Sequence, residues 1–165
     1  RHIASEENVS PEDIRAGIEN GSIVILRNKN HYITNYCAVG EDLRIKVNAN
    51  IGTSKGKSRL DYQLRRLRAV VEAGTDTVMD LSISGRIDRN RRRIISGIDI
   101  PVGTVPIYQA QIEAAKKHGA GVKMTIDNIF DVIERHAKDG VDYMTLHCGV
   151  TQEGIEKSRK GRCLL

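Results

Sequence analysis

The stretch Ile45–Ser54, which reads I-K-V-N-A-N-I-G-T-S, begins as an apolar strand-like run and ends in small polar residues around Gly52. A helix-patterned segment follows it. The same order recurs in V-M-D-L-S (Val78–Ser82), V-G-T-V-P-I-Y (Val102–Tyr108) and Y-M-T-L-H-C-G (Tyr143–Gly149). Apolar runs that alternate with helical segments indicate parallel strands joined by crossover helices. We therefore predict four parallel strands whose carboxyl ends converge on one small-molecule site.

The segments around these strands carry helix and turn signals. Ser10 before Pro11 is typical of a helix start, with Ile14 and Ile18 as its buried stripe and Gly21 at its end. The polar residues 27–42 predict a loop that reaches across a surface. We expect strands at Ile23–Leu26, Leu43–Ala49, Thr77–Leu81, Val102–Pro106 and Tyr143–His147, and helices at Leu60–Ala73, Arg86–Ser96, Tyr108–His118, 125–140 and Gly154–Lys160.

This alternation leaves two α/β architectures, a doubly wound sheet and a (β/α)8 barrel. The first strand is not followed by G-x-G-x-x-G, which disfavours the dinucleotide-binding version of the doubly wound sheet. Polar residues at the carboxyl end of each strand favour the barrel, whose active sites lie on that face. A barrel takes about 250 residues. We therefore predict that residues 43–165 form the first half of a (β/α)8 TIM-type barrel, that residues 1–42 form a small N-terminal appendage, and that the other half lies beyond Leu165.

The composition is that of a globular domain. Hydrophobic residues make up 39% and charged residues 28% of the 165 positions. Aromatic residues are only 4% and Trp is absent, so the core is expected to be aliphatic. No apolar run approaches the ~20 residues of a membrane span, and no secretory signal stands at the start. We expect a cytoplasmic protein with no membrane partner.

The three cysteines are an odd set without a C-x-x-C pair. Cys37, Cys148 and Cys163 therefore argue against a disulfide framework and against a metal cluster built from these residues alone. We predict no metal ligand in this chain.

The net charge of +5 comes mainly from two basic runs, at 55–68 and 86–93. One interpretation is binding of nucleic acid or phosphate. The other is the solvated outer face of two helices. The sequence has neither a recognised nucleic-acid motif nor an aromatic stacking platform, so we predict no nucleic-acid partner.

Candidate site residues stand at the ends of the first two strands. Asn48 and Asn50 alternate and should point to the same face, and Asn50 can offer both a donor and an acceptor to a ligand. The pattern alone leaves it equally open that Asn50 caps its own loop. Met79 is a residue type that most often fills a core. Asp80 can pair with Lys46 on the neighbouring strand or act on a ligand, and the pairing is the simpler interpretation.

The last two strands add Tyr108 and His147. Tyr108 follows the third strand and can present its hydroxyl to a phosphate or a ring nitrogen, or can be an amphipathic rim residue. His147 is a candidate ligand or proton carrier, although a single histidine is more often simply hydrogen-bonded in place. Cys148 beside it should point to the opposite face. The loops 52–54 and 82–85 can cradle a phosphate through backbone N–H groups, a weak signal by itself.

Four long blocks, in this order, resemble the phosphomethylpyrimidine synthase family of thiamine biosynthesis. They are N-A-N-I-G-T-S, D-T-V-M-D-L-S, P-V-G-T-V-P-I-Y-Q-A and G-V-D-Y-M-T-L-H-C-G-V. The upstream V-S-P-E-D-I-R-A-G-I-E-N-G is similar to the same family's N-terminal region. The resemblance covers nearly the whole chain.

The resemblance implies a (β/α)8 barrel that binds 5-aminoimidazole ribonucleotide. In this family a [4Fe–4S] cluster cleaves S-adenosylmethionine to a radical, which rearranges the ribonucleotide to 4-amino-5-hydroxymethyl-2-methylpyrimidine phosphate. By motif match, the substrate-binding residues are Asn50, Met79, Tyr108 and His147. For Met79, the resemblance replaces a core position with a substrate contact. It also implies a homodimer for the full-length protein.

Other parts of the family pattern do not match this sequence. The S-R-G and D-G-x-R motifs, a glutamate, two zinc-binding histidines and the cluster-binding cysteine motif are expected beyond Leu165. We therefore expect the 165-residue chain alone to be an inactive part of a carbon–carbon lyase. Locally, Leu26 stands where the family tends to have Pro, and Ile83-Ser84 where it tends to have Thr-Gly. The alternatives are 5-hydroxybenzimidazole synthase, which uses the same substrate, and a non-catalytic phosphate- or RNA-binding domain.

Overall fold

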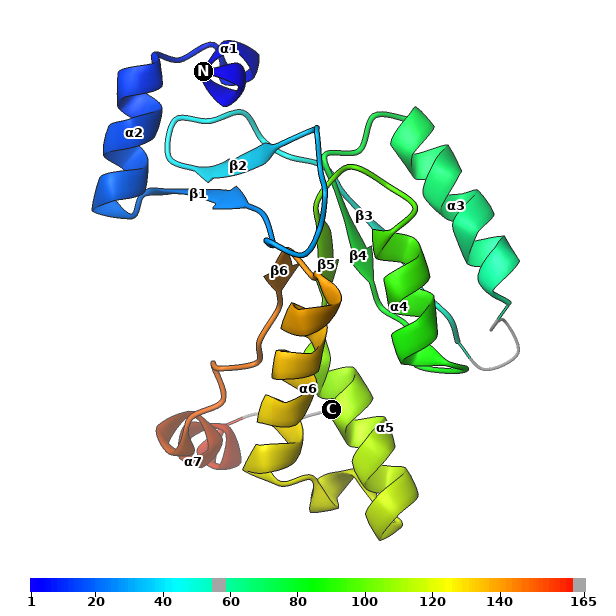
Figure 1. Cartoon of the computed structure of the whole chain (residues 1–165). Coiled ribbons are helices and arrows are strands. Elements are labelled where there is room, and N and C mark those ends of the chain that lie inside the picture. Colours follow the sequence, from blue (N-terminus) through cyan, green and yellow to red (C-terminus); the bar gives the residue numbers. More distant parts are fainter. Residues whose placement is uncertain (55–58, 162–165) are drawn as a thin grey trace.

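The chain folds into a mixed α/β structure with two sheets (Figure 1). The structure is a computed structural model that describes residues 1–54 and 59–161. Its N-terminal part contains α1 (His2–Glu7), α2 (Pro11–Asn20), β1 (Ile23–Leu26) and β2 (Cys37–Gly40). The rest contains β3 (Asn48–Ile51), α3 (Leu60–Glu72), β4 (Thr77–Asp80), α4 (Ile87–Ile95), β5 (Val102–Thr104), α5 (Pro106–His118), η1 (Gly121–Lys123), α6 (Ile126–Asp139), β6 (Tyr143–Met144) and α7 (Gln152–Lys160).

The N-terminal part has an antiparallel strand pair and an apolar cluster of its own. Helix α2 begins as predicted, because Ser10 and Asp13 form a reciprocal capping box, and it ends at Gly21 in a left-handed conformation. The prediction that Ile18 is buried was wrong, since Ile18 is exposed. Strand β2 lies inside the segment predicted as a loop. The cluster consists of Ile3, Ala4, Ile14, Ile23 and Ala38.

A four-stranded parallel sheet in the order β3-β4-β5-β6 carries the second part of the chain. The parallel sheet predicted from the repeated strand pattern is therefore confirmed. Its main apolar cluster joins the sheet to α3 and α4, which lie beside β3 and β4 in Figure 1. The buried members of that cluster are Ile51, Leu67, Val78, Ile94, Ile95, Ile100, Val102 and Val141. Side chains of the alternate positions, such as Asn50 and Met79, point to the other face of the sheet.

The strand boundaries differ from the prediction at both edges of this sheet. The first strand was placed at Leu43–Ala49, but β3 spans Asn48–Ile51. Ile45 is 93% exposed, and Val47 is tied instead to Asp76, whose carboxylate accepts from its backbone N–H. Strand β6 is only two residues long, because the ladder with β5 ends at Thr104. Hydrophobic periodicity does not show where the backbone pairing between two strands stops, so it does not predict so short a strand.

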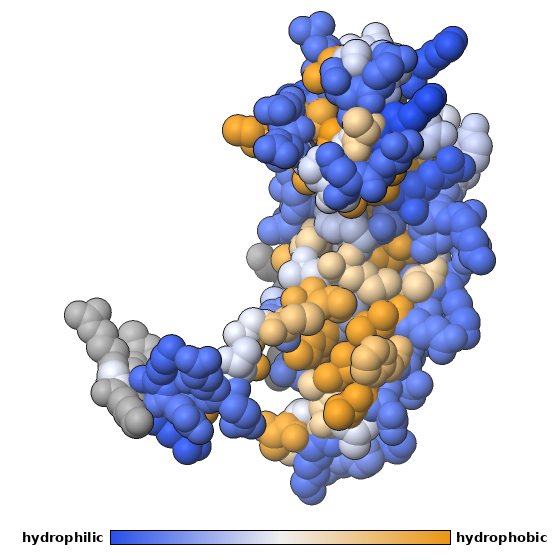
Figure 2. Space-filling view, turned by 90° about the vertical axis from the view of Figure 1, so that its left-hand side faces the viewer, coloured by the Kyte–Doolittle hydropathy of each residue, from blue (hydrophilic) through white to orange (hydrophobic). Residues whose placement is uncertain are grey.

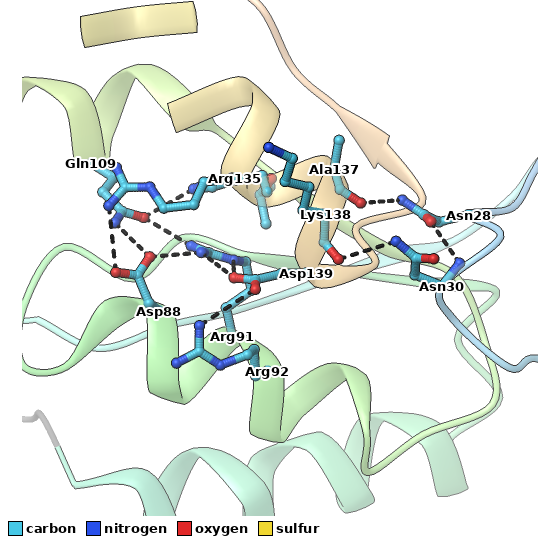
Figure 3. A network of polar contacts seen from close by, with 12 residues as sticks. Asn28, Asn30, Asp88, Arg91, Arg92, Gln109, Arg135, Ala137, Lys138 and Asp139 are labelled. Atoms are coloured by element: carbon cyan, nitrogen blue, oxygen red, sulfur yellow. Dashed lines mark hydrogen bonds and ion pairs between the residues drawn. The ribbon is translucent and has the colours of Figure 1, made fainter. Parts of the chain in front are cut away.

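Helices α4, α5 and α6 are joined by a network of charged and polar side chains (Figure 3). Arg91 of α4, 1% exposed, donates to Asp88, Asp139 and the Gln109 side chain. The interpretation of the second basic run as a solvated face is therefore wrong for Arg91. Periodicity missed it because two of its three partners, Gln109 and Asp139, come from later helices.

Candidate functional site

Asn50 and Met79 lie side by side on one face of the sheet. Their Cα atoms are partners in the β3–β4 register, and Met79 is in turn the partner of Gly103 on β5. Asn48 precedes Asn50 on the same face, as predicted, and its amide nitrogen donates to Asn50 Oδ1 over 2.9 Å. Asn50 is exposed, so the other atoms of its amide are open to a ligand.

Tyr143 on β6 is the register partner of Gly103, and its side chain extends across this face toward Asn48 and Thr77. Its ring lies over Gly103, where an added Cβ would come within 2.3 Å of the ring carbon Cζ. Its hydroxyl reaches Asn48 Oδ1 at 2.8 Å and Thr77 Oγ1 at 3.2 Å. Burial raises the pKa of Tyr143, although a hydrogen bond to Thr77 acts in the opposite direction. The phenol therefore stays a protonated donor at neutral pH.

Tyr108 and His147 form a second pair of candidate residues. Tyr108 lies in the first turn of α5, 36% exposed, and His147 follows β6 and is exposed. Their ring centroids are 6.1 Å apart, with the planes inclined by 48°. The Thr145 hydroxyl lies 4.0 Å from Met79 Sδ. The structure thus places Asn50 with Met79 and Tyr108 with His147, with Thr145 beside Met79.

Three residues at this face were missed by the sequence reasoning. Thr77, Tyr143 and Thr145 looked like ordinary strand residues. The sequence does contain one signal for two of them. Tyr143, Thr145 and His147 stand at alternate positions and therefore share a face in an extended chain. A glycine in β5 directly opposite a tyrosine in β6 is the second signal, but it requires knowing the register.

Asp80 does not face these residues. Residues alternate along β4, so Asp80 lies on the same side as the buried Val78, and its carboxylate accepts from the Ser82 backbone and hydroxyl at 3.0 and 2.5 Å. Burial raises the pKa of Asp80, against the effect of these hydrogen bonds and of Arg91. The predicted pairing with Lys46 was wrong. The Lys46 ammonium instead pairs with Glu7 at 2.9 Å.

The two loops after β3 and β4 are linked to the rest of the chain rather than free. Gly52 donates its backbone N–H to Gln63, and Thr53 donates its backbone N–H to the Ser82 hydroxyl. Ser82 and Ile83 donate their backbone N–H groups to Asp80 and to the Thr53 carbonyl. These four amides are therefore not available to a phosphate.

The residues described here do not fit a metal or iron–sulfur cluster. Within residues 1–54 and 59–161, no three His, Cys, Asp or Glu side chains are grouped so that they can hold a metal ion. Cys37 is buried, which raises the pKa of its thiol, and Cys148 is exposed elsewhere. Cys163 lies outside the described residues. In the same part of the chain, no helix is long and apolar enough to cross a membrane.

Comparison with known proteins places the chain in a family. The model of the radical SAM ThiC family matches residues 1–164. The chain belongs to this family. It is 49% identical over 160 residues to phosphomethylpyrimidine synthase of Desulforamulus reducens, which covers 97% of the chain and 37% of that protein. It is 44% identical over 157 residues to 5-hydroxybenzimidazole synthase BzaA of Moorella thermoacetica, which covers 95% of the chain and 36% of that protein.

The family membership confirms the resemblance found in the sequence. The chain spans a little over a third of the length of the curated relatives it matches. Phosphomethylpyrimidine synthase of Moorella thermoacetica, for example, is 49% identical over 158 residues, which is 96% of the chain and 37% of that protein. Radical S-adenosylmethionine proteins in general use S-adenosylmethionine with a [4Fe–4S] cluster, and the described residues provide no site for the cluster.

Proposed function

We propose that this chain forms the substrate-binding side of a phosphomethylpyrimidine synthase. In this proposal residues 43–165 are the first half of a (β/α)8 barrel and residues 1–42 are an appendage to it. The parallel order β3-β4-β5-β6 supports the proposal, as does the family model over nearly the whole chain. The reaction of the full-length enzyme is the rearrangement of 5-aminoimidazole ribonucleotide to 4-amino-5-hydroxymethyl-2-methylpyrimidine phosphate.

The observation that carries the proposal is that two pairs of candidate residues stand at or after the carboxyl ends of parallel strands. Asn50 and Met79 are adjacent across β3 and β4, and the rings of Tyr108 and His147 are 6.1 Å apart. In the proposal the Asn50 amide hydrogen-bonds the ribonucleotide and Met79 packs against it. The Tyr108 hydroxyl and the His147 imidazole contact its polar groups, and the face of either ring offers the ligand an apolar contact.

The chemistry requires groups from outside the described residues. We propose that the full-length protein is a cytoplasmic homodimer and a radical S-adenosylmethionine carbon–carbon lyase. Its [4Fe–4S] cluster and its zinc ion are held beyond Leu165. The lack of a metal-binding group among residues 1–54 and 59–161 is compatible with this division of roles. Residues 1–165 alone should then bind no cluster and show no turnover when iron, sulfide and S-adenosylmethionine are supplied.

A second candidate is 5-hydroxybenzimidazole synthase acting on the same ribonucleotide. It is favoured by the 44% identity to the relative of that name. The two functions share the proposed substrate site but differ in product. Mass spectrometry of the product made by the full-length protein separates them, because a pyrimidine phosphate and a hydroxylated benzimidazole differ in mass.

The substrate site is tested by two substitutions in the full-length protein. We expect Asn50→Ala and His147→Ala each to weaken ribonucleotide binding by about fivefold or more, the equivalent of one hydrogen bond. Both side chains are exposed, so the thermal unfolding midpoint should stay close to that of the wild type. Isothermal titration calorimetry measures the affinity, and His118→Ala at the end of α5 is the matched control. Unchanged affinity in both variants would contradict the assignment of the substrate site.

A further inference from the structure

We propose that Tyr143, Thr77 and Asn48 are positioning residues that fix the orientation of the Asn50 amide, so that its NH2 group faces the ligand. The inference rests on the proposed function, because it takes Asn50 as a ligand contact. It assigns a role to three side chains that do not themselves need to touch the ribonucleotide. It also states which kind of ligand atom Asn50 binds, namely a hydrogen-bond acceptor.

The four side chains form a continuous hydrogen-bonded chain across the sheet, from β6 through β4 to β3. Asn48 Oδ1 accepts from the Tyr143 hydroxyl at 2.8 Å and from the Thr77 hydroxyl at 3.0 Å. An amide oxygen has two lone pairs, so both are used. The Asn48 nitrogen is then directed at Asn50 Oδ1, 2.9 Å away. With Oδ1 of Asn50 held in this way, its Nδ2 is turned to the open side.

The opposite orientation of both amides satisfies fewer groups. If Asn48 were turned over, its nitrogen would donate to both hydroxyls, and Asn50 would donate to Asn48 Oδ1. Tyr143 and Thr77 would then have only each other as acceptors, at 3.2 Å. One of the two hydroxyl protons would have no acceptor within the network. Since an unpaired polar group in a partly buried site costs free energy, the observed orientation is the stable one.

Gly103 makes this arrangement possible. Tyr143 must cross β5 to reach Asn48, and it does so in the space left by the missing side chain, since an added Cβ would meet Cζ at 2.3 Å and Cε2 at 2.4 Å. The ring is thereby packed closely over Gly103. Asn48 thus has a rigid reference for its own orientation, which a water molecule in the same place would not provide.

A double-mutant cycle in the full-length protein tests the inference. We expect Tyr143→Phe to weaken ribonucleotide binding about threefold to tenfold, the effect of one lost hydrogen bond on the preferred orientation. In an Asn50→Ala background the same substitution should change the affinity less than about twofold, because its effect passes through Asn50. The thermal unfolding midpoint is followed for every variant. Tyr32→Phe, at an exposed tyrosine, is the matched control.

A second pair of variants, at Thr77, tests the inference without changing Tyr143. Thr77→Ser retains the hydroxyl and should retain the affinity, whereas the isosteric Thr77→Val removes the donor and should weaken binding like Tyr143→Phe. A role in folding alone would lower the unfolding midpoint in Thr77→Val and leave the affinity of the folded fraction unchanged.

The outcomes separate the inference from the proposed function. Equal effects of Tyr143→Phe with and without Asn50, or no effect of either Tyr143→Phe or Thr77→Val, overturn the positioning role while Asn50→Ala still weakens binding. If Asn50→Ala leaves the affinity unchanged, the substrate contact is wrong and the positioning role with it. Loss of affinity that appears only when Asn50 is present supports the inference.

Discussion

The residue with the clearest dependence on pH is His31, at the amino-terminal end of the parallel sheet. Its Nδ1 lies 2.7 Å from Asp142 Oδ2, and its Nε2 lies 3.1 Å from the Ile98 carbonyl. Both partners are acceptors, so the doubly protonated ring satisfies both contacts. Burial lowers the pKa of His31, but the hydrogen bond and charge of Asp142, together with the Ile98 and Ile95 backbone, outweigh it, and the pKa is raised above its ordinary value of 6.5.

This contact should make the stability depend on pH in a defined direction. The stabilisation is complete below pH 6.5 and is lost as the pH rises through the raised pKa, because the folded state then has to release a proton that it binds tightly. We expect His31→Gln to lower the thermal unfolding midpoint most at about pH 6 and less at about pH 9. His2→Gln, at a largely exposed histidine, serves as the control. A difference that grows with pH would contradict the charged form of His31.

Arg91 gives a second prediction at this scale. Its guanidinium is buried against the carboxylates of Asp88 and Asp139, at 2.6 and 2.5 Å. Arg91→Met removes the buried cation and leaves these two acids with longer ion pairs, to Arg135 at 3.6 Å and to Arg92 at 3.4 Å respectively. We expect a loss of about 3 kcal/mol in the free energy of unfolding. Chemical denaturation measures it. Arg89→Met on the exposed side of α4 should change this quantity by no more than about 0.5 kcal/mol.

The same residues show how much of the site can be predicted from sequence. Asn50, Tyr108 and His147 were candidates because each stands at or just after the end of a predicted strand. Met79 looked like a core residue and became a candidate only through the family resemblance. Their contribution to ligand binding remains a prediction. Tyr143 was not found, because its role depends on the β5–β6 register and on Gly103. Periodicity assigns a face to a side chain, but it does not assign the partner on the next strand.

At the scale of elements, the exit of β3 depends on Gly52. Its φ of 146° is a conformation that other residues rarely adopt, and an added Cβ would lie 2.6 Å from the Leu81 carbonyl carbon. We expect Gly52→Ala to lower the free energy of unfolding. If Asn50 binds the ribonucleotide as proposed, the substitution should also weaken that binding, since Asn50 is two residues away. Gly74→Ala is the matched control, because Gly74 also has a positive φ of 84° but nothing within 4 Å.

The size of the loss in the free energy of unfolding distinguishes backbone strain from a steric clash. Gly74→Ala introduces only the backbone cost of about 1–2 kcal/mol. Gly52→Ala adds a collision with main-chain atoms, which cannot move aside as a flexible side chain can. Differential scanning calorimetry of both variants should therefore give the larger loss for Gly52→Ala. Equal losses would mean that the β3 and β4 exits are not packed as described.

Elements with strong end signals were predicted well and those without them poorly. Helix α6 runs from the Thr125 cap to Gly140 as expected, and the cap forms a box with Asn128. The signals of the strands are weaker.

Along α6, Ile126 and Phe130 are 73% and 64% exposed although the pattern is apolar. Figure 2 shows apolar surface in the middle of one face of the molecule, beside the segment that leads out to α7.

At the scale of the whole molecule, the loop 27–36 joins the N-terminal part to the parallel sheet. The Asn28 side chain donates to the carbonyls of Ala137 and Val141, each at 2.8 Å, at the end of α6. The Asn28 backbone N–H donates to Asp142, which also accepts from the backbone of Val102. The sequence predicted that this segment reaches across a surface. It did not predict the destination, because the partners are more than a hundred residues away in the chain.

A substitution at Asn28 should therefore weaken the attachment of the loop 27–36 to the end of α6. Asn28→Asp replaces a double donor with a carboxylate that faces two carbonyl oxygens, so both contacts become repulsive. Asn20→Asp is the matched control, since Asn20 acts through Oδ1, which accepts from the Ser22 backbone and is retained in aspartate. We expect limited proteolysis of the full-length protein to cut within residues 27–36 on the order of tenfold faster in Asn28→Asp, because cleavage follows local opening. The His31–Asp142 contact holds the same loop. Raising the pH weakens this contact, so it should speed the cleavage in the wild type as well. Cleavage that is as slow in Asn28→Asp as in Asn20→Asp would show that the loop is not held by the end of α6.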